Sequence, residues 1–213
     1  LYGKNQKLKI IKSEEFDLLN RWLLSKFNSL IDSVTKSLDE YDATAASREI
    51  EKFAVEDLSN WWIRRSRSKF QLGENAVQKD LLRFILLELS KLIAPFTPFL
   101  AEHLHGQLHQ GTAAGTAQLS SGTTAVTASV HFLDWPAVNK KLIDKKLEEE
   151  MESVRKIVSL GLAARKDTGI RVRQPIVSLK IKMQNAKLKI NEELLDLIKD
   201  EVNVKEVVFE KGR

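Results

Sequence analysis

Apolar residues recur every three or four positions along much of the chain, which is the spacing of residues on one face of an α-helix. The first such pattern predicts a long helix over residues 13–41, with Ser13 as its N-cap. Glu14 and Glu15 would complement the helix dipole in its first turn. The apolar face of this helix is predicted to consist of Phe16, Leu19, Leu23, Phe27, Leu30, Val34, Leu38 and Tyr41.

A second helix with the same period is predicted to begin after its N-cap, Asp42. Its apolar positions are Ala46, Ile50, Phe53, Leu58, Trp61 and Trp62. Because the connection between the first two helices is short, we expect them to be antiparallel neighbours. The segment 76–94 is apolar on nearly every side, which predicts a helix buried at the centre of a bundle.

Prolines and a change of composition mark the middle of the chain. Pro95 ends the buried helix, and Thr97 followed by Pro98 predicts a further helix through about Leu108. Residues 106–129 are rich in Gly, Ala, Thr and Ser and contain no Lys, Arg, Asp or Glu. Such a segment buries too little apolar surface to offset the entropy lost on ordering, so we predict a flexible insertion.

The last third of the chain begins with a helix and then changes period. Residues 144–167 are predicted to form a long helix that Gly169 ends. Its buried positions are Leu147, Met151, Val154, Val158 and Leu162. Alternating apolar residues over 177–183 predict a strand, Asn191 is the expected N-cap of a short helix, and residues 204–209 predict a second strand.

These elements place the chain in the mainly α class. We expect an antiparallel helical bundle over residues 1–168, with the insertion 106–129 inside it. A small α/β unit of the β-α-β type is expected over residues 169–213.

The composition excludes several classes of function. The chain has no cysteine among its 213 residues, which excludes disulfides, thiolate metal sites and thiol nucleophiles. No apolar run reaches the roughly 18 residues that span a bilayer, and the N-terminus lacks a signal-peptide pattern. We therefore expect a soluble, cytoplasmic protein without a membrane partner. Because the sequence begins at Leu1 rather than at methionine, we expect it to be a piece of a longer protein.

The formal net charge of +5 is informative mainly through two clusters of basic residues. The first cluster follows Trp61 and Trp62 at the end of the second predicted helix and contains Arg64, Arg65, Arg67 and Lys69. The second cluster spans residues 165–174, at the end of the helix over 144–167 and in the turn that leaves it, and contains Arg165, Lys166, Arg171, Arg173 and Gln174. Arg171 and Arg173 are expected on one side of an extended segment, where they could hold a nucleic-acid backbone.

Both clusters predict contacts with nucleic acid. Arginine forms bidentate hydrogen bonds with phosphates, and planar side chains stack on unpaired bases. For the first cluster, a solvated helix end whose tryptophans lie in the core is the alternative. Adjacent residues on a helix point about 100° apart. We therefore expect at most one of Trp61 and Trp62 in the core, with Trp62 the weaker candidate for stacking.

Nothing in the sequence indicates a catalytic or metal site. His103 and His105 are two positions apart and do not share a helix face, and no carboxylate cluster accompanies them or His109. The sequence also lacks a glycine-rich phosphate loop, a Gly-x-Ser-x-Gly elbow and a paired-carboxylate signature. We therefore predict no catalytic residue, no metal ligand and no cofactor in this chain.

Several stretches together carry a family resemblance. They are LSNWWIRRSR (58–67), LSKLIAPFTPFLAE (89–102), SVHFLDWP (129–136) and GIRVRQP (169–175), the last followed by NVKEV (203–207). In this order they resemble the anticodon-binding region of the isoleucyl-tRNA synthetases, which are class I aminoacyl-tRNA synthetases. The Ala-Pro-Phe-x-Pro-Phe element is shared with valyl and leucyl relatives. The Trp-Ile-Arg-Arg-Ser-Arg and Val-Arg-Gln-Pro stretches carry the isoleucyl assignment.

The resemblance implies a helical bundle that docks the anticodon stem and loop of tRNA, followed by a small mixed domain. It implies two partners, tRNA(Ile) and the catalytic domain of a parent enzyme that ligates isoleucine to tRNA with ATP and Mg. The family's His-x-Gly-His and Lys-Met-Ser-Lys-Ser motifs are missing, so the chain itself is expected not to catalyse a reaction. The expected tRNA-binding residues are Trp61, Trp62, Arg64, Arg65, Arg67, Lys69, Arg171, Arg173 and Gln174.

Two alternatives remain open at this point. The chain could be the anticodon-binding domain of a valyl- or leucyl-type synthetase, since part of the motif set is shared. It could also be a structural helical domain that braces a protein partner, with solvated basic ends.

Overall fold

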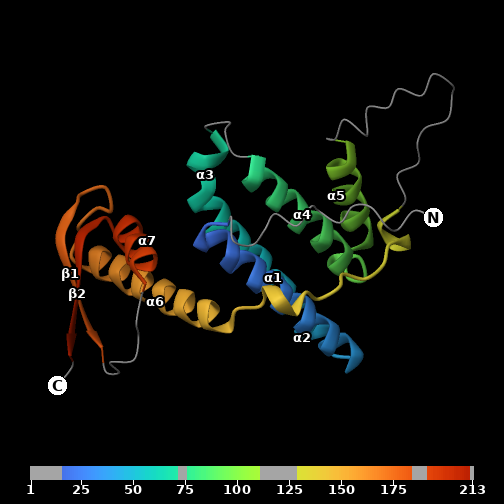
Figure 1. Ribbon diagram of the computed structural model, residues 1–213, viewed down its shortest axis with the longest axis horizontal. Helices are drawn as coiled ribbons and strands as arrows, with labels where there is room; N and C mark the ends of the chain where they lie inside the picture. The colour runs from blue at the N-terminus through green and yellow to red at the C-terminus, as the bar shows by residue number, and fades with distance from the viewer. Residues whose placement is uncertain (1–15, 72–75, 111–128, 184–190, 212–213) are drawn as a thin grey trace. The chain divides into compact units, whose positions relative to one another are not determined.

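The computed structural model describes residues 16–71, 76–110, 129–183 and 191–211 (Figure 1). The chain divides into two compact units, residues 1–143 and residues 144–213. The elements of the first unit are α1 (Leu18–Asp39), α2 (Ala43–Lys52), the π-helix η2 (Phe53–Ile63), α3 (Arg64–Gln71), α4 (Ala76–Ile93), α5 (Pro98–Gln110) and the 3-10 turns η3 (Val130–Phe132) and η4 (Lys140–Leu142). Those of the second unit are α6 (Lys145–Asp167), β1 (Ile176–Met183), α7 (Glu192–Val202) and β2 (Val204–Lys211). The predicted class, a helical bundle with a small α/β tail, is confirmed.

The first helix is capped by Asp17, whose Oδ1 accepts a hydrogen bond of 2.8 Å from the amide of Asn20. The expectation that the helix begins at Ser13 is wrong, because Asp17 is the N-cap and Leu18 the first helical residue; Ser13 itself lies outside the described residues. Helix α1 ends at Asp39, and the expectation that Tyr41 belongs to its apolar face is wrong, because Tyr41 is 96% exposed. The backbone of Tyr41 has a φ of 60°, which reverses the chain after the helix.

Helix α1 packs against the helical stretch that follows it. Asp42 caps α2 as predicted, with its Oδ1 accepting from the amide of Ala45 at 2.8 Å. Helix α2 continues into η2 and α3, and Figure 1 shows α1 lying beside this stretch. Only the short turn at residues 40–42 separates the two helices, so the predicted antiparallel pair is confirmed. The fully buried side chains of the pair include Trp22, Leu23, Phe27, Val34 and Trp62.

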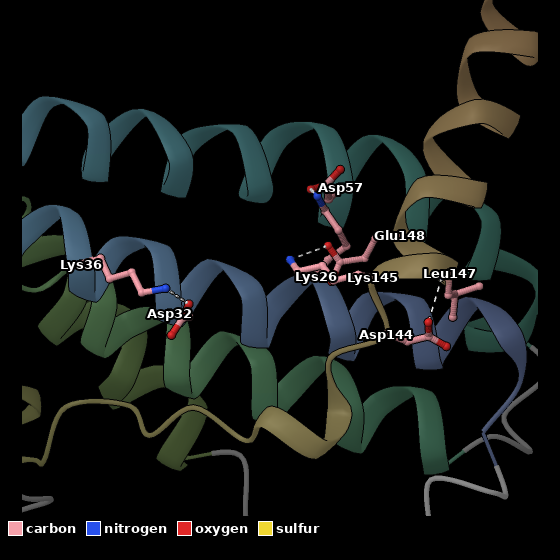
Figure 2. A network of polar contacts seen from close by, with 8 residues as sticks. All are labelled: Lys26, Asp32, Lys36, Asp57, Asp144, Lys145, Leu147 and Glu148. Carbon is pink, nitrogen blue, oxygen red and sulfur yellow. Dashed lines mark hydrogen bonds and ion pairs between the residues drawn. The ribbon is translucent and has the colours of Figure 1, made fainter.

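An ion pair crosses the same interface. Asp57 on η2 is buried, and Lys26 Nζ of α1 lies 4.0 Å from Asp57 Oδ2 (Figure 2). On the solvent side of α1, Lys36 pairs with Asp32 one turn away. A buried carboxylate is costly unless nearby charges or hydrogen bonds compensate it. Lys26 therefore favours one register of α1 against η2.

Helix α4 also contributes to the core formed by α1 and the α2–η2–α3 stretch. It buries one face, made of Leu81, Ile85, Leu89 and Leu92. Val77 is exposed, most of the other apolar side chains are half-buried, and Phe84 meets the ring of Phe27 edge-on at 6.4 Å between centroids. The predicted helix is confirmed, but α4 presents one buried face with half-buried flanks and is not enclosed on every side.

Helix α5 starts at Pro98 as predicted but runs on to Gln110. The expectation that a flexible insertion begins at Gly106 is therefore wrong. Arg83 of α4 explains the longer helix, because its Nη2 donates to the carbonyl of Leu108 at 2.9 Å and holds this end of α5. The rest of the predicted insertion, residues 111–128, lies outside the described residues.

The chain returns to the bundle at η3, which is fastened to α5. The Oε2 of Glu102 accepts from the Ser129 hydroxyl at 2.8 Å and from the amide of Val130 at 3.0 Å. The Ser129 hydrogen bond is the main cause that holds the pKa of the Glu102 carboxyl below its ordinary value. Further along, Trp135 Nε1 donates to Thr35 Oγ1 at 2.9 Å, so this connecting segment also lies against α1.

The second unit is a β-α-β arrangement with α6 packed on its helix. Asp144 caps α6 by accepting from the amide of Leu147 at 3.0 Å (Figure 2). Strands β1 and β2 pair in parallel, with Ile176 opposite Val204, and α7 connects them. Both predicted strands and the predicted helices are confirmed. The core of the unit contains Met151, Val154 and Val158 of α6 with Leu194, Ile198 and Val202 of α7.

Helix α6 belongs with the tail, which differs from the expected division after residue 168. Gly161 shows why, because a Cβ at this position would lie 3.1 Å from both methyl groups of Val202. The close approach that glycine permits lets α6 and α7 pack tightly. The period of a helix shows which face is buried but not which partner buries it, so the sequence alone placed α6 in the bundle.

Candidate nucleic-acid interface

The first basic cluster lies on α3, which is held to the bundle by one face. Trp62 and Ser66 are almost completely buried, and Phe70 continues the same face one turn further on. The rings of Trp62 and Phe70 meet edge-on at 5.7 Å between centroids. Since this face is turned inward, the side chains of Arg64 and Arg67 are exposed on the other side of the helix.

The expectation that one tryptophan faces outward is wrong. Trp61 is 6% exposed and Trp62 is fully buried, so neither ring offers a face on which an unpaired base could stack. Trp62 Nε1 also donates to the buried Oδ1 of Asn20 at 2.9 Å. Both residues lie in η2, where hydrogen bonds run from residue i to residue i+5 and the turn is wider than in an α-helix. The 100° spacing used for the prediction does not hold there.

The four cations of this cluster divide into two pairs with different surroundings. Arg65 is half-buried with its guanidinium 5.7 Å from the centre of the Trp61 ring, a cation–π contact. Lys69 forms an ion pair with Asp17, the N-cap of α1. Arg65 therefore covers the buried ring of Trp61 on the same helical stretch, and Lys69 fastens α3 to the start of α1. The structure does not support the prediction that Arg65 and Lys69 contact RNA.

The other pair, Arg64 and Arg67, we call the outer α3 arginines. Arg64 Nε donates to the carbonyl of Asn60 at 3.0 Å on its own helix, and its side chain is exposed. Arg67 is exposed and has no ion-pair partner in the part of the chain that the structure describes. Three positions apart on an α-helix, the two side chains lie on the same side of α3. They can contact successive phosphates of one strand.

The predicted contacts of the second cluster lie in the turn between α6 and β1, residues 170–174, which we call the basic turn. Arg171, Arg173 and Gln174 are all exposed. The expectation of an extended segment is wrong, because the amide of Gln174 donates to the carbonyl of Arg171 at 3.0 Å and closes a turn. Gly169, with a φ of +69°, precedes this turn and ends α6 as predicted.

The basic turn rests on Arg165, which the sequence analysis placed in the second cluster but did not select as a tRNA contact. Its side chain is 2% exposed, and its guanidinium donates to backbone carbonyls of the turn and of the junction between α7 and β2. The signal was available in the sequence. On the apolar face of α6, Arg165 lies one turn beyond Gly161 and two turns beyond Val158. A charged residue at such a buried position requires a specific partner.

Chemically, both surfaces suit the sugar-phosphate backbone of a nucleic acid. Exposed guanidinium groups donate two parallel hydrogen bonds to a phosphate and release condensed counterions, which supplies affinity without reading the sequence. The side-chain amide of Gln174 both donates and accepts hydrogen bonds, which suits it to a base edge or a 2′-hydroxyl as well as to a phosphate. Each surface belongs to its own unit.

The histidines of α5 do not form a metal site within the described residues. His103 is exposed and His105 is buried on α5, and no three metal-ligating side chains gather within the described ranges. The side chain of His109 lies outside the described residues. Among the helices that are described, none is long and apolar enough to cross a membrane.

Comparison with known proteins assigns the chain to a family. A family model described as the anticodon-binding domain of tRNA ligase matches residues 20–182. The isoleucine–tRNA ligase of Dehalococcoides mccartyi is 38% identical over 198 residues, which are 91% of this chain and 18% of the relative. That of Clostridium tetani is 33% identical over 216 residues, covering 98% of this chain and 19% of the relative. Isoleucine–tRNA ligase 2 of Bacillus cereus is 37% identical over 191 residues, 88% of this chain and 17% of the relative. The chain thus spans under a fifth of the length of these relatives.

Proposed function

The chain belongs to the family of anticodon-binding domains of tRNA ligases, and we propose that it docks the anticodon stem and loop of tRNA(Ile) within an isoleucine–tRNA ligase. The match of the family model over residues 20–182 carries this proposal, since that range includes both basic surfaces. The relatives named above are isoleucine–tRNA ligases, which supports the choice of tRNA.

The residues proposed to contact tRNA are the outer α3 arginines, Arg64 and Arg67, with Arg171, Arg173 and Gln174 of the basic turn. The five side chains are exposed and polar, as phosphate and ribose contacts require. Trp61, Trp62, Arg65 and Lys69 are assigned instead to holding α3 in place, because their side chains are buried or paired within the bundle.

In the parent enzyme, aminoacylation would use ATP and Mg. No residue of this chain is proposed to bind either one, because the chain lacks the His-x-Gly-His and Lys-Met-Ser-Lys-Ser motifs of the catalytic domain. The proposed role of the chain is to position tRNA(Ile) so that the catalytic domain, its second proposed partner, receives the correct acceptor end.

The choice of tRNA is tested by binding. We expect the purified chain to bind an unmodified tRNA(Ile) transcript at least about tenfold more tightly than a tRNA(Val) transcript, a difference of about 1.4 kcal/mol. Affinities are measured at the same salt concentration, because phosphate contacts make every value salt-dependent. Tighter binding of tRNA(Val) would instead identify a valyl-type domain. Equal, weak binding of both would favour the structural alternative, in which the bundle braces a protein partner.

A further inference from the structure

A buried charge lies beneath the basic turn. Arg165, on the last turn of α6, is 2% exposed. Its guanidinium donates to five backbone carbonyls. They belong to Val202 at 2.8 Å, Gln174 at 2.6 Å, Asn203 at 3.1 Å, Arg171 at 3.4 Å and Val172 at 3.5 Å.

These acceptors come from two segments that lie far apart in the sequence. The three shortest bonds reach Gln174 in the basic turn and Val202 and Asn203 at the junction of α7 and β2. The two longer contacts, to Arg171 and Val172, are near the limit for a hydrogen bond. Arg165 therefore joins the end of α6, the turn and the start of β2 at one point.

Arg165 has no carboxylate partner in the described part of the chain. Buried arginines are usually paired with an acid, since an unpaired charge is costly to remove from water. Here the oxygen ends of backbone carbonyl dipoles replace the acid. They surround the guanidinium only when the turn adopts the observed conformation. The planar guanidinium, with five donors in a fixed fork, is suited to hold that shape.

Asn203, the C-cap of α7, holds the same turn. Its backbone has a φ of 53°, and its Nδ2 donates to the carbonyl of Val172 at 2.8 Å. The amide of Ile176 in turn donates to the carbonyl of Asn203 at 3.1 Å. Asn203 thus holds the middle of the basic turn and the first residue of β1, which follows it.

We propose that Arg165 is a positioning residue for tRNA, which holds the basic turn so that Arg171 and Arg173 are presented outward before the RNA arrives. This inference rests on the proposed function. Its physical basis is preorganisation, because a turn that is already ordered loses less entropy when its side chains engage a phosphate. Burial prevents Arg165 itself from contacting the RNA.

A mutant cycle tests the inference in the whole chain. Arg165→Lys keeps the charge but loses the planar fork, and it is measured in the parent and in an Arg171→Ala/Arg173→Ala background. In the parent we expect Arg165→Lys to weaken tRNA binding about fivefold or more. In the double-alanine background the same change should alter affinity less than about twofold, because the side chains that it positions are gone. Equal losses in both backgrounds, or no loss in the parent, would overturn the inference.

Two controls separate this test from folding and from the proposed function. Arg165→Met, which removes every donor, should have the larger effect if it folds, and Lys156→Met removes an exposed charge from the same helix and should have little effect.

Hydrogen exchange without RNA tests the positioning alone. In Arg165→Lys the amides of Gln174 and Ile176 should lose protection while those of Val154 and Val158 keep it. Unchanged protection of the Gln174 amide would overturn the positioning role of Arg165. If Arg171→Ala/Arg173→Ala leaves tRNA affinity intact, the proposed function is overturned, and the role of Arg165 in tRNA binding falls with it.

Discussion

Replacing Arg171 and Arg173 together by alanine is expected to weaken tRNA binding at least about tenfold near physiological salt and to reduce its salt dependence. Each guanidinium that contacts a phosphate releases counterions when it binds. The slope of log affinity against log salt should therefore become shallower by about 0.7–0.9 for each contact that is lost. Affinity measured at four or more salt concentrations gives both quantities. The Arg64→Ala/Arg67→Ala pair should behave in the same way.

The matched control is Lys140→Ala/Lys141→Ala, which removes the same charge from exposed positions on η4. Its slope should stay close to that of the parent, because these lysines are not among the proposed contacts. If both arginine pairs fold normally and keep the parent slope, the clusters are solvated helix and turn ends, and the structural alternative is favoured.

Trp62→Ala is expected to lower the free energy of unfolding of the first unit by about 3–5 kcal/mol. The side chain is fully buried, its ring meets Phe70, and its Nε1 satisfies the buried Oδ1 of Asn20. Removing it leaves a cavity and an unsatisfied acceptor, and each of these is destabilising. The loss is a large part of the 5–15 kcal/mol that typically separates folded from unfolded domains. Urea denaturation followed by circular dichroism measures it.

The comparison variant is Trp135→Ala. Trp135 is 37% exposed and also donates a hydrogen bond through its Nε1, to Thr35. Its replacement should cost clearly less than that of Trp62, because a partly exposed site leaves no closed cavity. A loss below about 1 kcal/mol for Trp62→Ala would contradict the buried position and would restore this ring as a candidate for base stacking.

Local signals in the sequence predicted most of the elements correctly. The cap Asp42, the stop at Gly169 and the change of period after it all depend on residues within a few positions of each other. Such short-range chemistry determines where helices and strands begin and end. The short connection after the first helix and the apolar helix faces predicted the antiparallel bundle, and the family resemblance implied the same architecture.

Features that depend on distant residues were not predictable in this way. The π-helical turns of η2 bury both Trp61 and Trp62, and an argument from regular α-helical spacing cannot foresee them. Arg165 is satisfied by carbonyls that follow it by as many as 38 positions. Its role becomes visible only once α6, α7 and β2 are assembled. The structure therefore revised the predicted site more than the predicted fold. The exposed arginines remain proposed tRNA contacts, whereas the buried or paired residues of the site are assigned structural roles.

The central claim is that the outer α3 arginines and the basic turn bind the anticodon stem and loop of tRNA(Ile). The most direct measurement is a titration of the 15N-labelled chain with an RNA hairpin of that stem and loop, followed by backbone and arginine side-chain NMR signals. The account predicts saturable shifts at Arg64, Arg67, Arg171 and Arg173, with much smaller shifts from an acceptor-stem hairpin of equal length. Shifts confined to other residues, or equal shifts from both hairpins, would contradict it.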